Sequence, residues 1–75
     1  MKIVTCNVNG IRSAFSKGFF DWYKRQRADI LCLQELKAHA DQIDLDKMFP
    51  KNTFSYLKCA DKKGYSGVSI HTKRK

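Results

Sequence analysis

The chain has 75 residues, which is enough for one small domain or part of one. Apolar residues make up 43% and aromatic residues 12%, a composition that excludes a disordered tail. A formal charge of +8 favours a polyanionic partner. Nucleic acid fits better than an anionic membrane, because the charge is not accompanied by a long apolar segment, a signal peptide or a basic amphipathic helix. We therefore expect a soluble intracellular protein.

The cysteines are odd in number and widely spaced along the chain, at Cys6, Cys32 and Cys59. Two of them lie in apolar or strand-like runs, which predicts reduced, mostly buried thiols. A zinc site is the alternative, but it needs paired spacing such as C-x-x-C, which this sequence does not have.

The first half of the chain has the pattern of a βαβ unit. Residues 2–8 alternate and are rich in β-branched side chains, which predicts a strand closed by a turn at Asn9-Gly10. Residues 16–27 place apolar side chains at helical spacing, with cations near the C-terminal end, as is typical of an amphipathic helix. The apolar run 30–33 predicts a strand buried on both faces, parallel to the first.

The second half predicts a short helix followed by a hairpin. Residues 41–48 suit a helix that Phe49-Pro50 ends. Residues 53–59 and 66–72 alternate in polarity, and a turn at 61–64 would join them as antiparallel strands. The expected fold class is α/β with a mixed sheet, and residues 1–75 are expected to form one small domain or part of one. The aromatic side chains expected in the core, rather than as platforms for base stacking, are Phe19, Phe20, Trp22, Phe54 and Tyr56.

Polar side chains follow both strands of the predicted parallel pair. Asn7 and Asn9 come after the first strand, and Gln34 and Glu35 after the second. The loops after parallel strands open into a shared crevice, so these side chains are expected to converge. Mg²⁺ prefers oxygen ligands, usually one or two carboxylates completed by water and phosphate, which makes Glu35 the best candidate ligand. The alternatives are a helix-capping or solvent-exposed Glu, and an Asn-Gly pair that only makes a turn.

Three segments resemble exonuclease III-type abasic-site endonucleases, of the endonuclease/exonuclease/phosphatase superfamily. They are residues 2–12 (KIVTCNVNGIR), residues 29–37 (DILCLQELK) and residues 64–70 (GYSGVSI), and they occur in the family's order and approximate spacing. The resemblance runs along nearly the whole chain, but it covers only the opening part of a family member.

The resemblance implies a fold and an activity. The fold would be the N-terminal part of a two-sheet, four-layer α/β sandwich that is incomplete in this chain, and the full-length member would be a monomer. The activity would be Mg²⁺-dependent hydrolysis of the phosphodiester 5′ to abasic sites in double-stranded DNA, with 3′-5′ exonuclease activity as a second expected activity and Mn²⁺ as an alternative metal. The location would be cytoplasmic, at the nucleoid in a bacterium, or nuclear in a eukaryote.

The resemblance also implies a metal site. Glu35 would be the direct Mg²⁺ ligand, and Asn7 would be its neighbour in the same site. Lys37 and Asn9 would lie at the edge of the active site, where Lys37 would help to hold the site's geometry and the negative charge nearby. The simpler interpretation of Lys37 is a surface residue at the start of a helix.

Three further positions would contact DNA. The resemblance implies that Arg12 and Lys17 contact phosphates and that Tyr65 reaches the DNA near the minor groove. The simpler interpretations are two ordinary solvated cations and a sheet aromatic.

The chain departs from the family's pattern at two places. Cys6 stands where the family usually has a large aromatic side chain, and Leu36 where Thr is common. These departures weaken the expectation that the activity is the same as in the family, rather than the family assignment.

The residues that orient the attacking water in the family are missing from these 75 residues. They are a tyrosine, an Asp-x-Asn motif and a terminal Ser-Asp-His motif, and neither His39 nor His71 follows an Asp. Both histidines are expected at the surface or in the hairpin. The chain alone is therefore expected to be an inactive N-terminal part of a nuclease. The alternatives are a non-catalytic basic nucleic-acid-binding module and a phosphodiesterase or phosphatase of the same superfamily.

Overall fold

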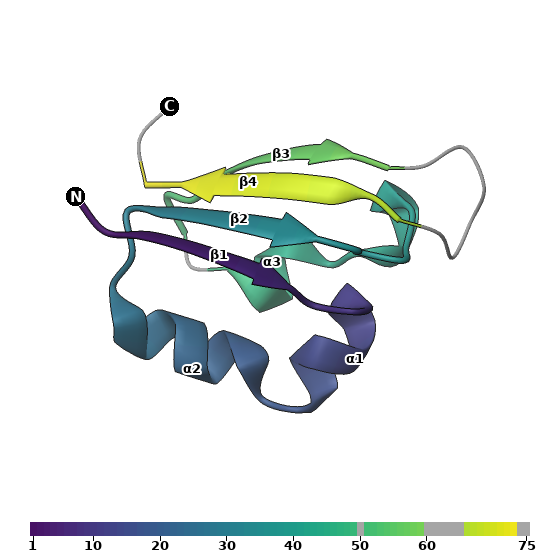
Figure 1. Cartoon of the computed structure of the whole chain (residues 1–75), viewed down its shortest axis with the longest axis horizontal. Helices are drawn as coiled ribbons and strands as arrows, with labels where there is room; N and C mark the ends of the chain where they lie inside the picture. Colours follow the sequence, from purple (N-terminus) through teal and green to yellow (C-terminus); the bar gives the residue numbers. More distant parts are fainter. Residues whose placement is uncertain (50, 60–65, 74–75) are drawn as a thin grey trace.

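The computed structural model describes residues 1–49, 51–59 and 66–73. A four-stranded mixed sheet carries helices on one of its faces (Figure 1). The elements in chain order are β1 (Ile3–Asn7), α1 (Ile11–Ser16), α2 (Phe19–Gln26), β2 (Ile30–Gln34), the 3-10 turn η1 (Ala40–Gln42), α3 (Leu45–Met48), β3 (Phe54–Lys58) and β4 (Val68–Thr72).

The positions of the predicted strands are confirmed. The expectation that the strand over 30–33 is buried on both faces was wrong, because Leu31 and Leu33 are buried on one face but Ile30 on the other face is only half-buried. β1 and β2 are parallel, with Ile3 opposite Ile30 and Asn7 opposite Gln34. β3 and β4 are antiparallel, as a hairpin requires, and the predicted turn at 61–64 lies outside the described residues. β4 also pairs with β2, so the sheet order is β1-β2-β4-β3 and the sheet is mixed, as expected.

The helix predictions need correction. The helix predicted over 16–27 corresponds to α2, which begins only at Phe19 because Gly18, at φ 87, separates it from α1. The sequence did not predict α1. The segment 41–48 forms a 3-10 turn and then α3, whose N-cap Asp44 accepts a hydrogen bond from the Lys47 N–H at 3.3 Å. In the described part of the chain, no helix is long and apolar enough to cross a membrane.

The core lies between the helices and one face of the sheet. Alternation along the strands sends Leu31 and Leu33 of β2 to this face, where both are buried. Phe20 meets Phe49 edge-on with ring centroids 5.0 Å apart. The buried apolar residues are Ile11, Phe20, Tyr23, Ala28, Leu31, Leu33, Leu36, Ala38, Ile43, Met48 and Phe49.

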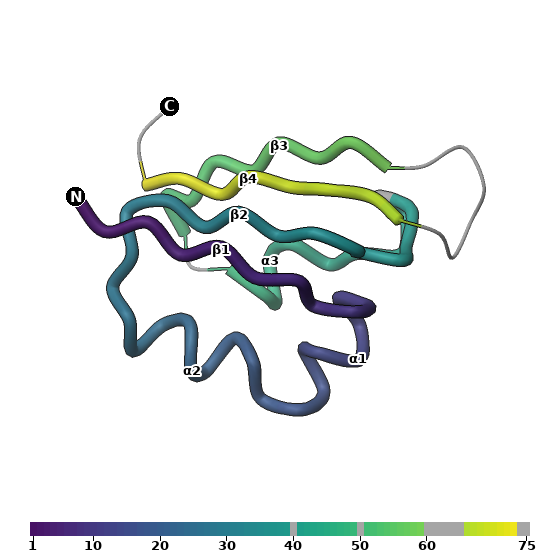
Figure 2. Tube along the Cα trace, in the orientation of Figure 1, coloured from purple at the N-terminus to yellow at the C-terminus, as the bar shows by residue number. Residues whose placement is uncertain are grey.

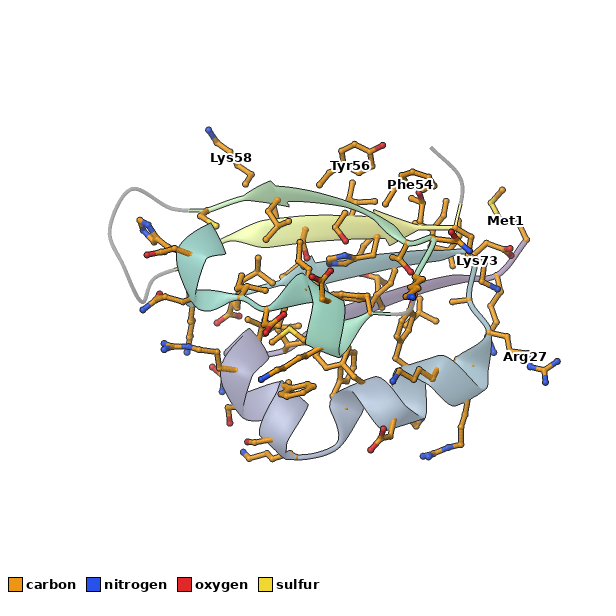
Figure 3. All side chains as sticks on the ribbon, turned by 180° about the vertical axis from the view of Figure 1, so that it is seen from behind. Met1, Arg27, Phe54, Tyr56, Lys58 and Lys73 are labelled. Carbon is orange, nitrogen blue, oxygen red and sulfur yellow. The ribbon has the colours of Figure 1, made fainter. Side chains whose placement is uncertain are left out.

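The opposite face of the sheet is uncovered by the described residues and carries large apolar side chains. Phe54 and Tyr56 project from β3 away from the helices (Figure 3) and are 38% and 51% exposed. Trp22 on α2 is 41% exposed. The expectation that these three aromatics lie in the core was therefore wrong. For Phe54 and Tyr56 the reason is that period-2 alternation identifies one face of a strand but not which face is covered. For Trp22 the reason is that a run of aromatic residues in a helix does not say which of them face the core.

His71 lies in the hairpin as expected, but it is fully buried rather than at the surface. Its Nδ1 and Nε2 each form a 2.7 Å hydrogen bond, to the hydroxyls of Ser55 and Ser69. Its ring stacks on Phe49 with centroids 3.9 Å apart. Burial lowers the pKa of His71 to about 4, so the imidazole is neutral at pH 7.

The three cysteines are free thiols, in agreement with the sequence. They are half-buried rather than mostly buried, since Cys6, Cys32 and Cys59 all lie at intermediate exposure. Cys6 packs at the edge of the core.

Candidate metal centre

The candidate site lies where the parallel strands end. Asn7 closes β1 opposite Gln34 of β2, so Glu35 comes directly beyond the same edge of the sheet. The antiparallel β4 begins at this edge too, with Val68 opposite Gln34 (Figure 2). Three loops therefore meet there, as expected at the carboxyl ends of parallel strands.

The structure brings Asn7 and Glu35 together. The side-chain Nδ2 of Asn7 donates a hydrogen bond to Oε2 of Glu35. The backbone N–H of Asn9 donates to Oδ1 of Asn7 at 3.0 Å. Both the oxygen and the nitrogen of the Asn7 side-chain amide therefore have hydrogen-bond partners. This holds the amide with its nitrogen facing the Glu35 carboxylate.

Lys37 lies beside the same carboxylate. Its Nζ donates to Oδ1 of Asn9 and is 4.0 Å from Oε1 of Glu35. The side chains of Lys37 and Glu35 are 41% and 44% exposed, so solvent screens their attraction, and such a pair contributes at most about 1 kcal/mol. The contact therefore adds little to the stability of the fold.

The backbone of the site is held in an unusual conformation. Asn9, Glu35 and Lys37 have φ values of 47°, 53° and 53°, in the left-handed region. For a non-glycine residue this costs roughly 1 kcal/mol each, and Asn tolerates it better than Glu or Lys. The surrounding contacts must therefore hold the residues in place.

The loop after β1 supplies part of that support. The N–H of Gly10 donates to the carbonyl of Glu35 at 2.8 Å, and the N–H of Ile11 donates to the carbonyl of Leu36 at 2.9 Å. Leu36 itself is fully buried. The buried Leu36 therefore anchors the backbone of the adjacent Glu35, while the Glu35 carboxylate stays accessible to solvent.

The donor groups fit a magnesium ion. Glu35 offers one carboxylate, and Oδ1 of Asn7 keeps a second lone pair after it accepts the Asn9 N–H. Mg²⁺ is commonly held by one or two carboxylates, with water and phosphate oxygens as the other ligands. Among the described residues there is no cluster of three or more His, Cys, Asp or Glu side chains, so this part of the chain would supply only some of the ligands.

The structure describes two of the three residues that are predicted to contact DNA. Arg12 is exposed in the first turn of α1, and Lys17 is exposed just after that helix. Lys17 lines a cavity of about 400 Å³ together with Asn7 and Asn9, so it lies on the side of the metal-site loop. Tyr65 lies outside the described residues.

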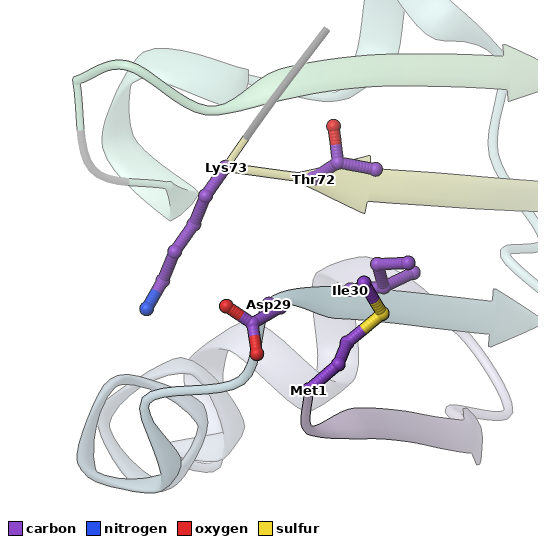
Figure 4. Close-up of a pocket in the computed structure, with 5 residues that line it drawn as sticks. All are labelled: Met1, Asp29, Ile30, Thr72 and Lys73. Atoms are coloured by element: carbon purple, nitrogen blue, oxygen red, sulfur yellow. The ribbon is translucent and has the colours of Figure 1, made fainter.

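A second cavity, of about 370 Å³, lies at the other end of the sheet (Figure 4). Asp29 lines it just before β2 begins, whereas Glu35 follows the end of β2. The Asp29 carboxylate accepts the backbone N–H of Lys2 at 2.8 Å. This cavity therefore shares no residue with the candidate metal centre.

The sequence did not indicate that Ser66 and Gly67 contribute to the site. The carbonyl of Gly67 accepts the N–H of Leu36 at 3.2 Å, and the carbonyl of Ser66 accepts the N–H of Lys37 at 2.7 Å. The available signal was the Ser-Gly pair at the start of the strand predicted over 66–72, which indicates a special backbone conformation without saying what it contacts.

Two nucleases are similar to this chain in sequence. A DNA-(apurinic or apyrimidinic site) endonuclease of Dictyostelium discoideum is 41% identical over 75 residues, which are 100% of this chain and 20% of that protein. An exodeoxyribonuclease of Bacillus subtilis is 41% identical over 99% of this chain and 29% of its own length. The chain therefore spans well under a third of these relatives.

Solved structures share the fold. The catalytic domain of Xenopus laevis APE2 matches with a TM-score of 0.75 and 38% identity, over 96% of this chain and 23% of that one. A 3'-5' exonuclease (NExo) of Neisseria meningitidis matches with a TM-score of 0.79 and 29% identity, over 97% of this chain and 27% of that one. A model of the endonuclease/exonuclease/phosphatase family matches residues 4–75. With paired polar side chains at the ends of its parallel strands and homologues among abasic-site endonucleases and exodeoxyribonucleases, the chain belongs to the endonuclease/exonuclease/phosphatase family.

Proposed function

We propose that this chain supplies the first part of the metal site of a Mg²⁺-dependent DNA-repair nuclease that cleaves the phosphodiester 5′ to abasic sites in double-stranded DNA. The observation that carries the proposal is the contact between Asn7 and Glu35 at the ends of two parallel strands. The similarity to an abasic-site endonuclease and an exodeoxyribonuclease supports the choice of substrate.

Each residue of the site has a separate task. Bound Mg²⁺ would supply stabilisation of the negative charge that develops on the phosphodiester. Glu35 would hold the ion, and Asn7, whose NH₂ donates to the Glu35 carboxylate, would add its amide oxygen. Lys37, hydrogen-bonded to Asn9, places a positive charge beside the carboxylate.

The isolated chain is proposed to bind magnesium and DNA without efficient cleavage. A water nucleophile needs a group that orients it or takes its proton, and the transition state needs several placed donors. Residues 1–75 contain none of the Asp-x-Asn and Ser-Asp-His motifs expected for these tasks.

The test is a nicking assay with a labelled duplex that carries one abasic site. The purified chain would be incubated with Mg²⁺ next to Glu35→Ala and a chelator control, and Mg²⁺ binding would be followed by NMR in the same samples. We expect Mg²⁺ binding that Glu35→Ala abolishes, and no nicking. Absence of any Mg²⁺ binding by the folded wild-type chain would refute the metal-site proposal. Nicking that depends on Glu35 would show that residues 1–75 are sufficient.

A second candidate function is non-catalytic binding of nucleic acid. It is favoured by the net charge of +8 and by the exposed cations Arg12 and Lys17 near the strand-end loop. This function predicts DNA binding that depends steeply on salt but is unchanged by Mg²⁺ or by Glu35→Ala. The same set of samples separates the two candidates.

A further inference from the structure

We propose that Gly67 is a positioning residue for Glu35, which it holds in place through Leu36. The inference deepens the proposed function and rests on it, because the importance of Glu35 comes from its proposed place in the metal site. Gly67 lies just before β4, far from Glu35 in sequence but next to its turn in space.

The turn at residues 35–37 is held from two sides. On one side, Gly10 and Ile11 donate their N–H groups to the carbonyls of Glu35 and Leu36. On the other, Leu36 and Lys37 donate their own N–H groups to the carbonyls of Gly67 and Ser66, at 3.2 and 2.7 Å. The turn therefore has both its donors and its acceptors engaged, which keeps Glu35 and Lys37 in their left-handed conformation.

A side chain at position 67 would disturb this arrangement. Gly67 has φ 93, which L residues rarely adopt, and it is buried. A Cβ there would lie 3.3 Å from Cβ of Leu36 and 3.7 Å from its Cγ and Cδ1. Leu36 has no room to withdraw, since it is fully buried and bonded through its backbone to Ile11 and Gly67. The added methyl group would therefore push the turn that carries Glu35.

Gly18 offers a matched control. It has φ 87, close to that of Gly67, but nothing lies within 4 Å of a Cβ built on it. Gly18→Ala thus imposes a similar backbone strain without any contact to the metal-site turn. A difference between Gly67→Ala and Gly18→Ala isolates the contact with Leu36.

D-alanine in place of Gly67 provides a second comparison. A D residue is at ease at positive φ, and its methyl group leaves Cα on the side opposite to the L position that meets Leu36. The variant is accessible by joining a synthetic segment that begins at Cys59 to a thioester of residues 1–58. L-alanine and D-alanine at this position differ in where one methyl group lies and in backbone strain, and Gly18→Ala is the control for the strain.

The experiment compares the wild-type chain, Gly67→Ala, Gly18→Ala and the D-alanine chain by NMR. Without metal, it follows the side-chain NH₂ resonances of Asn7, the exchange of the Leu36 and Lys37 amides, and the exchange of the Leu33 amide in β2. A titration with Mg²⁺ alone then gives each dissociation constant. For Gly67→Ala we expect shifted Asn7 resonances, faster exchange at Leu36 and Lys37, unchanged exchange at Leu33, and Mg²⁺ binding weakened roughly tenfold.

Gly18→Ala and the D-alanine chain are expected to bind Mg²⁺ with an affinity within about twofold of wild type. This change is much smaller than the roughly tenfold loss expected when a supporting contact is removed. An equal loss of Mg²⁺ affinity in Gly18→Ala or in the D-alanine chain would overturn the proposal. Faster exchange of the Leu33 amide in Gly67→Ala would overturn it too, because Gly67 would then support the stability of the whole fold. If the folded wild-type chain binds no Mg²⁺, the proposed function fails, while the metal-free resonances of Asn7 and Leu36 still decide whether Gly67 positions the turn.

Discussion

At the scale of single residues, His71 is the side chain whose environment departs most from its sequence context. It sits in an alternating hairpin strand, yet its imidazole is enclosed between two serine hydroxyls and the ring of Phe49. Both ring nitrogens have partners, so the buried neutral form is fully hydrogen-bonded. The sequence could not indicate this, because a histidine in a strand suits either face.

The lowered pKa of His71 predicts a pH-dependent stability. The folded chain takes up this proton only near pH 4, whereas the unfolded chain takes it up near pH 6.5, so the unfolded state binds more protons between these values. The His71 contribution is therefore complete above pH 6.5 and is lost as the pH falls to about 4, by an amount on the order of 3 kcal/mol. Urea denaturation at several pH values between about 7 and 4 measures this loss.

The control for this prediction removes the whole hydrogen-bonded group. A chain with His71→Leu, Ser55→Ala and Ser69→Ala leaves no hydroxyl without its partner, and its stability should vary much less over the same pH range. His39→Gln removes the other histidine and serves as a parallel control. An undiminished pH dependence in the triple variant would assign the effect to other groups.

At the scale of elements, α2 divides its aromatic side chains between the core and solvent. Phe20 is 3% exposed and meets the rings of Phe15, Phe19, Tyr23 and Phe49. Trp22, two residues later, is 41% exposed and meets only Phe19 among the aromatic contacts of the described residues. Helical spacing alone made both of them candidates for the core.

This division predicts a large difference between two substitutions in one helix. Phe20→Ala should destabilise the chain by about 3–5 kcal/mol, because it removes buried area and leaves a cavity. Trp22→Ala should cost about 1 kcal/mol or less, since half-exposed residues contribute little. Far-UV circular dichroism during urea denaturation gives both values. Similar losses for the two variants would mean that Trp22 is buried in solution.

At the scale of the whole molecule, the sheet is covered on one face and open on the other. The open face bears Ile3, Phe54, Tyr56, Val68 and Ile70, each at least 38% exposed. The resemblance led us to expect an incomplete two-sheet sandwich, and this open face fits that expectation. The excess of cations is also a property of the whole chain, and it acts over longer range than any single contact.

The charge predicts how DNA binding responds to salt. The logarithm of the binding constant should fall linearly with the logarithm of the NaCl concentration, because bound phosphates release counterions. Arg12→Ala and Lys17→Ala should each reduce the slope by about 1, if each side chain contacts one phosphate. Arg25→Ala, in the last turn of α2, should leave it unchanged, because that end of the helix lies away from the loop after β1 (Figure 1). Fluorescence anisotropy with a labelled duplex measures the slopes, and equal effects of all three variants would indicate diffuse binding.

Much of the fold, and the convergence of Asn7 and Glu35, could be predicted from the sequence alone. Local alternation and apolar runs predicted all four strands, since side-chain period and β-branching act within a few residues. Asn7 and Glu35 were expected to converge, because parallel strands end at one edge of a sheet, and the structure places them in contact. The sequence motifs also indicated the family, which the match over residues 4–75 shows.

The tertiary structure alone decided which faces are covered and what holds the site in place. Phe54 and Tyr56 are exposed because burial depends on the layer packed opposite, which a strand's own pattern does not contain. The insertion of β4 between β2 and β3 brings Gly67 against Leu36, a contact between segments far apart in the chain. Residue types and spacing are local properties, whereas coverage and support arise only when distant segments pack together.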